Sequence, residues 1–262
     1  MNIKFYHAHD VREHFEGYTE SDEPEVIVTD RFTKLDSIPP TVKYIVHCSS
    51  GFENLPEIPD TVKLFRATTA NVKQVAEYVL SMTLHTLRKL PQCDVASWTR
   101  PLGTTLYDKR DLVIGYGHIG KEVARLYSMF TDNIHVYDPY VQHDFTKGNL
   151  DKLDYDVVTV HVPLNTQTKQ MLSKPFFSTL PTTTLFINAA RQGVLNENDL
   201  RDWIQRGGTA IIDTFNEEPY TGDLHSVAVC TPHMGAMTVE SQRAMITQPK
   251  HDFEHYIRTK RS

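Results

Sequence analysis

Short apolar runs rich in β-branched residues alternate with stretches of helical periodicity along the chain. Continuous apolar runs of this kind predict strands of a parallel sheet that is covered on both faces. We expect strands at 3–6, 25–29, 43–47, 62–66, 111–114, 134–137, 157–162, 184–187, 210–214 and 228–231. The pattern therefore predicts an α/β fold.

A long helix followed by an irregular segment divides this pattern in two. From about Asn71 the apolar positions follow a period of about 3.6 residues. They are Val72, Val75, Ala76, Val79, Leu80, Leu84 and Leu87. The next stretch, 92–109, is polar and contains Pro101 and Gly103, which favour a loop. We interpret it as a connector between two α/β domains.

Composition narrows the class of protein. Apolar residues make up 40% of the chain and charged residues 23%, which is typical of a soluble globular protein. The net charge of −6 argues against a nucleic-acid partner, because such a protein needs a basic face. No stretch approaches the roughly 18 apolar residues of a membrane span, and the first residues lack the apolar core of a signal peptide.

The cysteines indicate a compartment. Cys48, Cys93 and Cys230 are widely spaced and form no CxxC pair, which favours a reducing environment without disulfides or a zinc site. We therefore expect a cytoplasmic protein with no metal, no membrane contact and no nucleic-acid partner.

The stretch DLVIGYGHIGKEVARLYSMF places Gly115, Gly117 and Gly120 in the spacing GxGxxG, between a predicted strand and an amphipathic helix. In such a loop the first glycine permits the tight turn and the second lets backbone amides approach a pyrophosphate. The third allows the helix to pack closely on the sheet. The helix N-terminus adds unpaired N–H donors and a partial positive charge. The loop therefore predicts a dinucleotide-binding site.

An acidic residue ends the next predicted strand. Asp138 lies about twenty residues beyond the glycine loop, where a carboxylate binds the ribose 2′-hydroxyl of a dinucleotide. A carboxylate at this position repels the 2′-phosphate of NADP, so NAD is the predicted cofactor. The alternative interpretation is a tight strand–helix turn with a surface aspartate.

Polar side chains follow several later strands, and ligands of open parallel sheets lie beyond the carboxyl ends of the strands. Arg191 follows TLFIN, Glu217 and Glu218 follow AIIDTF, and His233 follows VAVCTP. An arginine can hold a carboxylate through paired hydrogen bonds, and a histidine can transfer a proton near neutral pH. A carboxylate beside the imidazole fixes its tautomer. Beside a nicotinamide, these groups predict reduction of a 2-oxo acid.

Each of these residues also has a simpler interpretation. Arg191 fits a surface ion pair, and Glu218 fits a solvated turn as well as Glu217 does. Asp213, within an apolar run, bonds either backbone amides or the nicotinamide ribose, and both alternatives stay open. His161 is interpreted as a core histidine. No metal-ligand spacing and no Ser–His–Asp arrangement competes with this interpretation.

Five ordered stretches resemble the D-isomer-specific 2-hydroxyacid dehydrogenase family, in the branch that contains phosphoglycerate dehydrogenase and glyoxylate/hydroxypyruvate reductase. They are VIGYGHIG with Asp138, HVPLNTQT, FINAARQGVLNENDL, DTFNEEP and CTPHMGAMT, and the resemblance spans roughly residues 62–238. It implies a two-lobed α/β protein with a Rossmann-type dinucleotide-binding domain and a smaller flavodoxin-like α/β substrate domain. The implied substrate domain is 1–90, completed by 238–262, and the implied NAD-binding domain is 91–237.

The resemblance also implies roles for individual residues. Arg191, Glu218 and His233 match the family's catalytic residues. Its NAD contacts match His118, Ile119, Asp138, Val162, Ala189, Ala190, Arg191, Asp213, His233 and Gly235, in addition to Gly115, Gly117 and Gly120. Ser50 and Gly51, in SSGFENL, resemble the loop whose backbone amides bind the substrate carboxylate, and Asn71 matches a position near that site.

Departures from the family pattern concern two side chains and two lengths. Gln192 replaces the glycine that usually follows the arginine, and Asn165 replaces the usual threonine. The chain is shorter than its relatives in two places, between Pro219 and Val227 and at 92–109. The segment 92–109 resembles the arm through which relatives dimerise, so the resemblance implies a homodimer.

The leading hypothesis is an NAD-dependent oxidoreductase that interconverts a small D-2-hydroxy acid and its 2-oxo acid, with glyoxylate or hydroxypyruvate as candidate substrates. Formate oxidation is disfavoured, because that relative is expected to have glutamine in place of Glu218. The alternative is a corepressor-like protein that senses NAD with little or no turnover.

Overall fold

The computed structural model describes residues 1–6, 11–52 and 54–261 and divides into two compact units. One unit contains Met1–Asn71 and Thr238–Ser262, and the other contains Val72–Met237. The boundary lies before helix α1 (Val72–Leu87), whereas the family resemblance implies a boundary between residues 90 and 91. Helix α1 joins the second unit because it packs against helix α2 (His118–Tyr127).

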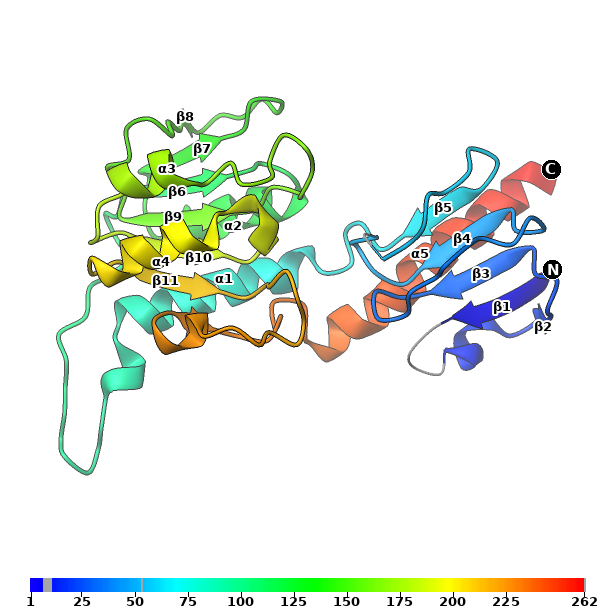
Figure 1. The fold of residues 1–262 in the computed structure, drawn as a ribbon, viewed down its shortest axis with the longest axis horizontal. Coiled ribbons are helices and arrows are strands. Elements are labelled where there is room, and N and C mark those ends of the chain that lie inside the picture. Colours follow the sequence, from blue (N-terminus) through cyan, green and yellow to red (C-terminus); the bar gives the residue numbers. More distant parts are fainter. Residues whose placement is uncertain (7–10, 53, 262) are drawn as a thin grey trace. The chain divides into compact units, whose positions relative to one another are not determined.

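The first unit is built on a parallel sheet with the order β2-β1-β3-β4-β5, which is the flavodoxin-like order (Figure 1). Its strands are β1 (Asn2–Tyr6), β2 (Thr19–Glu20), β3 (Val26–Thr29), β4 (Tyr44–His47) and β5 (Lys63–Arg66). Helix α5 (Val239–Arg261) returns from the other end of the chain and packs on β4 and β5. The predicted α/β class and strand positions are confirmed here, to within a residue or two.

The two faces of this sheet are covered differently. Side chains alternate between the faces of a strand, so Val26 and Val28 pack in one cluster with Phe253 of α5. Ile27 faces the opposite way, toward a cluster that includes Leu35 from a loop. The sequence pattern predicts helices between the strands, and in the described residues this is wrong for 30–43 and 54–62, which are irregular. Each of these two stretches contains two prolines, which interrupt helical hydrogen bonding.

The second unit contains a seven-stranded sheet in the order β12-β11-β10-β9-β6-β7-β8, and every pairing is parallel (Figure 1). Its strands are β6 (Asp111–Ile114), β7 (Ile134–Tyr137), β8 (Thr146–Lys147), β9 (Val157–Val160), β10 (Leu185–Asn188), β11 (Thr209–Ile212) and β12 (Val229–Cys230). The chain moves from β6 to β7 on one side and later to β9 on the other. This reversal creates a switch point at β6, where doubly wound sheets bind dinucleotides.

Helices cover both faces of this sheet. Residues of α1 and α2 share a buried cluster with Val113 and Ile187. Helices α3 (Lys174–Thr179) and α4 (Glu197–Gln205) pack on the other face, where Trp203 is fully buried with Phe186. Since alternate residues of one strand enter the two clusters, the apolar runs of the sequence are continuous. The Rossmann-type architecture predicted for this part of the chain is confirmed.

Two further features of the second unit concern segments outside the sheet. Strand β9 ends at Val160, two residues before the predicted end, because Pro163 has no N–H to continue the ladder. The connector after α1 is irregular, as expected, apart from 3-10 helix η2 (Leu90–Gln92) and an isolated antiparallel bridge between Asp94 and Thr99. None of the helices in the described ranges combines the length and apolar character that a membrane span requires.

Candidate functional site

The glycine loop between β6 and α2 has three different backbone environments. Gly115 has a φ of +92°, and a Cβ there would lie 2.8 Å from Val162 Cγ1. A Cβ on Gly120 would lie 1.9 Å from the Gly115 carbonyl oxygen, whereas one on Gly117 would meet nothing within 4 Å. The turn itself thus requires Gly115 and Gly120, and Gly117 borders open space at the N-terminus of α2. His118 and Ile119 begin that helix, so their amides lack intrahelical partners. The loop can accommodate a pyrophosphate.

Asp138 follows β7 and holds two loops together. Its Oδ2 accepts a hydrogen bond from the Tyr116 N–H at 2.7 Å, which ties it to the glycine loop. Its Oδ1 accepts from the N–H groups of Tyr140 at 2.9 Å and Val141 at 3.1 Å. Each carboxylate oxygen has about two acceptor directions, so Oδ2 retains one for a ribose hydroxyl. The residues present therefore fit an NAD molecule bound across the β6–β7 edge.

His233 and Glu218 form a hydrogen-bonded pair beyond the end of β12. The imidazole Nδ1 lies 2.8 Å from Glu218 Oε1 and 3.0 Å from Oε2. Because a carboxylate is an acceptor, Nδ1 carries the donating proton and Nε2 points elsewhere. His233 has a φ of +54°, an uncommon backbone conformation for a histidine. The adjacent Glu217 forms no part of this pair.

Asp213 fixes the backbone that carries His233. It is 1% exposed, and its Oδ1 accepts hydrogen bonds from Thr231 Oγ1 at 2.6 Å and from the Met234 N–H at 2.7 Å. Its Oδ2 accepts from the Gly235 N–H at 2.9 Å, and its main-chain carbonyl accepts from the His233 N–H at 2.8 Å. Of the two alternatives left open for Asp213, the structure shows the bonds to backbone amides.

Tyr78 of helix α1 extends this network. It was not among the predicted site residues. Its hydroxyl lies 2.5 Å from Thr231 Oγ1, and Thr231 in turn donates to Asp213. Burial raises the pKa of the Tyr78 hydroxyl above its usual range, so the group remains a donor. Tyr78 and Thr231 are 153 positions apart, and the only sequence signal was the place of Tyr78 on the apolar side of the helix.

Arg191 follows β10 in extended backbone, and a buried amide shapes its turn. Asn188 is fully buried; its Oδ1 accepts from the Ala190 N–H at 3.1 Å, and its Nδ2 donates to the Arg191 carbonyl at 3.2 Å. The guanidinium Nη1 of Arg191 donates to the Ala190 carbonyl at 2.9 Å. Asn188 was not among the predicted site residues, although its place at a strand end is the kind of signal that identified Arg191.

The strand order explains how these residues gather at one edge. Beyond the carboxyl ends of β12, β11, β10, β9, β6 and β7 lie His233, Asp213, Arg191, Val162, Gly115 and Asp138 respectively. Ala189 lies between Asn188 and Ala190 in the same turn. In a parallel sheet all these ends share one edge. His161, beside Val162, is half-buried with its Nε2 inaccessible to solvent, and burial lowers the pKa of its imidazole to about 3, so the ring is neutral near neutral pH.

Ser50, Gly51 and Asn71 belong to the first unit. The Ser50 carbonyl accepts from Arg66 Nη1 at 3.0 Å, and the Gly51 carbonyl lies 2.7 Å from His47 Nε2. Asn71 is buried at the end of this unit. These contacts fix the carbonyl groups of the 50–51 turn inward, and the role of its amides toward a substrate stays a prediction.

This combination of sheet order, glycine loop and acidic strand end defines a dinucleotide-binding α/β protein. The family model for "D-isomer specific 2-hydroxyacid dehydrogenase, NAD binding domain" matches residues 77–235. The chain therefore belongs to the D-isomer-specific 2-hydroxyacid dehydrogenase family, and the cofactor of this family domain is NAD.

Individual relatives agree with this assignment. The chain is 28% identical over 245 residues to a D-3-phosphoglycerate dehydrogenase of Bacillus subtilis, covering 85% of this chain and 46% of the relative. It is 31% identical over 225 residues to the Mycobacterium bovis protein of the same name, covering 78% and 43%. The chain thus spans less than half the length of these relatives.

Solved structures share the fold. A glyoxylate reductase from Paecilomyes thermophila superimposes with a TM-score of 0.85 at 19% identity, covering 97% of this chain and 94% of that one. A D-lactate dehydrogenase from Aquifex aeolicus, complexed with NAD and lactic acid, superimposes with a TM-score of 0.82 at 20% identity, covering 99% and 96%.

Proposed function

We propose that this protein is an NAD-dependent oxidoreductase that interconverts a small D-2-hydroxy acid and its 2-oxo acid. The observation that carries the proposal is the His233–Glu218 pair, with its 2.8 Å contact, on the same sheet edge as the glycine loop. An acid–base pair at this edge is what hydride chemistry on a bound 2-oxo acid requires. The family assignment supports the same reaction.

Each residue has a distinct part in the proposed reaction. Bound NADH supplies the hydride that the carbonyl carbon of the substrate accepts. His233 Nε2 donates the proton to the carbonyl oxygen, and Glu218 keeps Nδ1 protonated and the ring oriented. The guanidinium of Arg191 binds the substrate carboxylate and polarises the carbonyl. In the oxidation direction His233 accepts the hydroxyl proton instead.

We assign the two functions of the enzyme to the two units. The unit Val72–Met237 holds NAD through the residues of the glycine loop and through Asp138. The unit Met1–Asn71 with Thr238–Ser262 contains Ser50 and Gly51, whose amides we assign to the substrate carboxylate, and Asn71, which matches a position near that site in the family. The names of the curated relatives add D-3-phosphoglycerate to glyoxylate and hydroxypyruvate as candidate substrates.

A panel of substrates tests the proposal. NADH oxidation is followed at 340 nm with glyoxylate, hydroxypyruvate, pyruvate and branched 2-oxo acids, and NAD reduction with D-3-phosphoglycerate. We expect turnover with at least one small 2-oxo acid and loss of that turnover in Arg191→Ala. A protein that binds NADH but turns over none of these compounds would instead be the NAD sensor that forms the alternative.

We also propose that the protein is a homodimer that pairs through the connector 92–109. In Figure 1 this segment extends away from the second unit as a long loop. Val95, Trp98 and Leu102 are 85%, 67% and 91% exposed, which is more apolar side-chain surface than an isolated loop usually leaves in water. Sedimentation should give a dimer for the wild type and a monomer for Trp98→Ser/Leu102→Ser. A monomeric wild type refutes this proposal alone.

We further propose a cytoplasmic location, because the free thiols Cys48, Cys93 and Cys230 suit a reducing compartment.

A further inference from the structure

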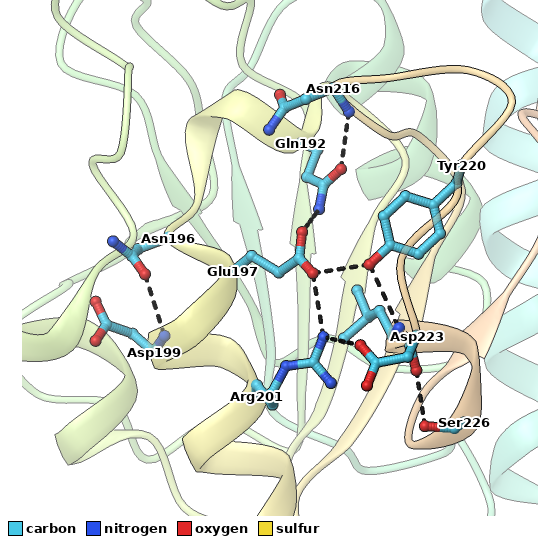
Figure 2. Close-up of polar contacts among 10 residues, drawn as sticks. Gln192, Asn196, Glu197, Asp199, Arg201, Asn216, Tyr220, Asp223 and Ser226 are labelled. Carbon is cyan, nitrogen blue, oxygen red and sulfur yellow. Dashed lines mark hydrogen bonds and ion pairs between the residues drawn. The ribbon is translucent and has the colours of Figure 1, made fainter.

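Gln192 departs from the family pattern, and its side chain is buried with a hydrogen bond at each of its two polar atoms. Only 2% of the residue is exposed. Its Oε1 accepts a hydrogen bond from the Asn216 N–H at 2.8 Å, and its Nε2 donates to Glu197 Oε2 at 2.5 Å (Figure 2). The side chain therefore joins the turn that carries Arg191 to helix α4 and to the segment after β11.

Glu197, the first residue of α4, is the centre of a larger polar cluster. Its Oε1 accepts from the Tyr220 hydroxyl at 2.8 Å and from Arg201 Nη2 at 3.2 Å. Arg201 also forms an ion pair of 2.8 Å with Asp223. Figure 2 shows Gln192, Tyr220 and Arg201 converging on this one carboxylate. Burial raises the pKa of Tyr220, so its hydroxyl remains a donor.

The cluster holds the segment that carries Glu218. The segment has no regular secondary structure, and Asn216 to Pro219 are exposed, so packing alone does not fix it. Its contacts with the rest of the unit instead include three polar attachments at Asn216, Tyr220 and Asp223, which lie on both sides of Glu218 in sequence.

An aromatic pair transmits this restraint to the carboxylate. The Phe215 and Tyr220 rings stack with centroids 4.3 Å apart and planes at 25°. The Phe215 N–H donates to Glu218 Oε1 at 3.3 Å, and the same oxygen lies 2.8 Å from His233 Nδ1. Displacement of Tyr220 or Asn216 would therefore move the backbone that presents Glu218 to His233.

We propose that Gln192 and Glu197 are positioning residues of the active site. Together they hold the segment 215–223 so that Glu218 stays against the imidazole of His233. The consequence for catalysis rests on the proposed dehydrogenase function, whereas the effect on the imidazole does not. In this proposal the position of Glu218 depends on two residues that contact neither substrate nor cofactor.

The principal test is Gln192→Leu, which keeps a side chain of similar size and removes both hydrogen bonds. We expect kcat for 2-oxo acid reduction to fall at least tenfold, with KM changed less than threefold and NADH affinity unchanged. The pH above which kcat for reduction falls should move to a lower value, as in Glu218→Gln, because the carboxylate favours the protonated imidazole. If Gln192→Leu does not fold, Tyr220→Phe takes its place as the test. It removes one hydroxyl from the same cluster and should change kcat and the pH profile in the same direction.

An exchange variant separates positioning from general destabilisation. Gln192→Glu/Glu197→Gln again pairs a carboxylate with an amide at the same place and preserves an acceptor for the Asn216 N–H. It should recover at least half of the lost activity on a logarithmic scale. Glu122→Gln is the matched control, since Glu122 forms a 2.7 Å ion pair with Arg125 on α2. It should leave kcat at the wild-type value.

A readout without turnover distinguishes this proposal from the proposed function. Long-range ¹H–¹⁵N spectra of labelled histidines, with His233→Gln to assign the signal, report the tautomer of the imidazole. In Gln192→Leu the His233 signal should move toward its position in Glu218→Gln. If the wild type turns over no 2-oxo acid and the signal still moves, only the proposed function fails. A folded Gln192→Leu or Tyr220→Phe protein with the wild-type kcat and the wild-type histidine signal overturns the inference. A variant whose NADH affinity falls by the same factor as its kcat overturns it too.

Discussion

Asp111, at the start of β6, provides a prediction about stability because its carboxyl group is buried without compensation. The residue is fully buried, and among the described residues neither carboxylate oxygen has a hydrogen-bond partner. Burial raises the pKa of Asp111 from the usual 3.8 to about 8, with a smaller contribution from the carboxylate of Asp156 and opposition from Lys109. In the native state this carboxyl group therefore holds its proton at neutral pH.

The sign and size of the effect follow from proton linkage. Between about pH 4 and pH 8 the unfolded chain has released a proton that the native state retains, so the free energy of unfolding falls as pH rises. The loss is about 1.4 kcal/mol per pH unit, or about 3 kcal/mol at pH 6 and up to about 5 kcal/mol at pH 8. Asp111→Asn removes the titration. The variant should therefore gain stability relative to the wild type by these amounts as pH rises from 4 to 8.

Urea unfolding at each pH measures the difference, with the fluorescence of the buried Trp203 as a probe of this unit. The constant offset between the two proteins at pH 4 includes the hydrogen-bonding needs of the new amide, so the slope with pH is the decisive quantity. Asp132→Asn is the control. Asp132 is exposed and precedes Asn133, whose carbonyl accepts from the Asp111 N–H, and its replacement should leave the slope of stability against pH unchanged. Parallel stability curves for wild type and Asp111→Asn would refute the reasoning.

Three further predictions concern the site itself. His233→Gln should lower turnover about 100-fold or more while NADH affinity, measured by fluorescence titration, stays nearly unchanged; unaltered turnover would exclude its proton-transfer role. Asp138→Ala should weaken NADH binding and narrow the preference for NADH over NADPH in paired titrations, because the carboxylate that repels a 2′-phosphate is gone. An unaffected preference would place the ribose contact elsewhere. Gly120→Ala should lower the melting temperature, since its Cβ would lie 1.9 Å from the Gly115 oxygen. Gly117→Ala should keep the wild-type melting temperature and lower only the affinity for NADH, because a Cβ there meets nothing within 4 Å. Equal melting temperatures for the two variants would contradict this account of the loop.

Much of the fold could be read from local patterns. The buried strands appeared as apolar runs, and α1 appeared from its helical period, because burial of one face leaves a repeat within a few residues. Helix α4 was not predicted, although its N-cap Asn196, which accepts from the Asp199 N–H at 3.2 Å, is a residue type that favours helix starts. The two-residue strands β2 and β8 were missed because such short pairs leave no repeat.

The site divides in the same way. The glycine loop and the residues at strand ends could be located because strand direction alone brings them to one edge. The partners of those residues could not be found, since Tyr78 reaches Thr231 across 153 positions and Gln192 reaches Asn216 across 24. Gln192 was noticed only as a departure from the family pattern. Its function depends on Glu197, and nothing in the spacing predicted that contact.

By itself the sequence determined the α/β class, the glycine loop, its acidic strand end and the residue types available for proton transfer. These are properties of short segments, whose burial and turn geometry depend on neighbouring positions. The tertiary structure alone decided which unit contains α1, that Asp213 bonds backbone amides, and that Glu218, not Glu217, lies 2.8 Å from His233. Those outcomes depend on contacts between distant segments, and such contacts are set by the packing of the whole unit.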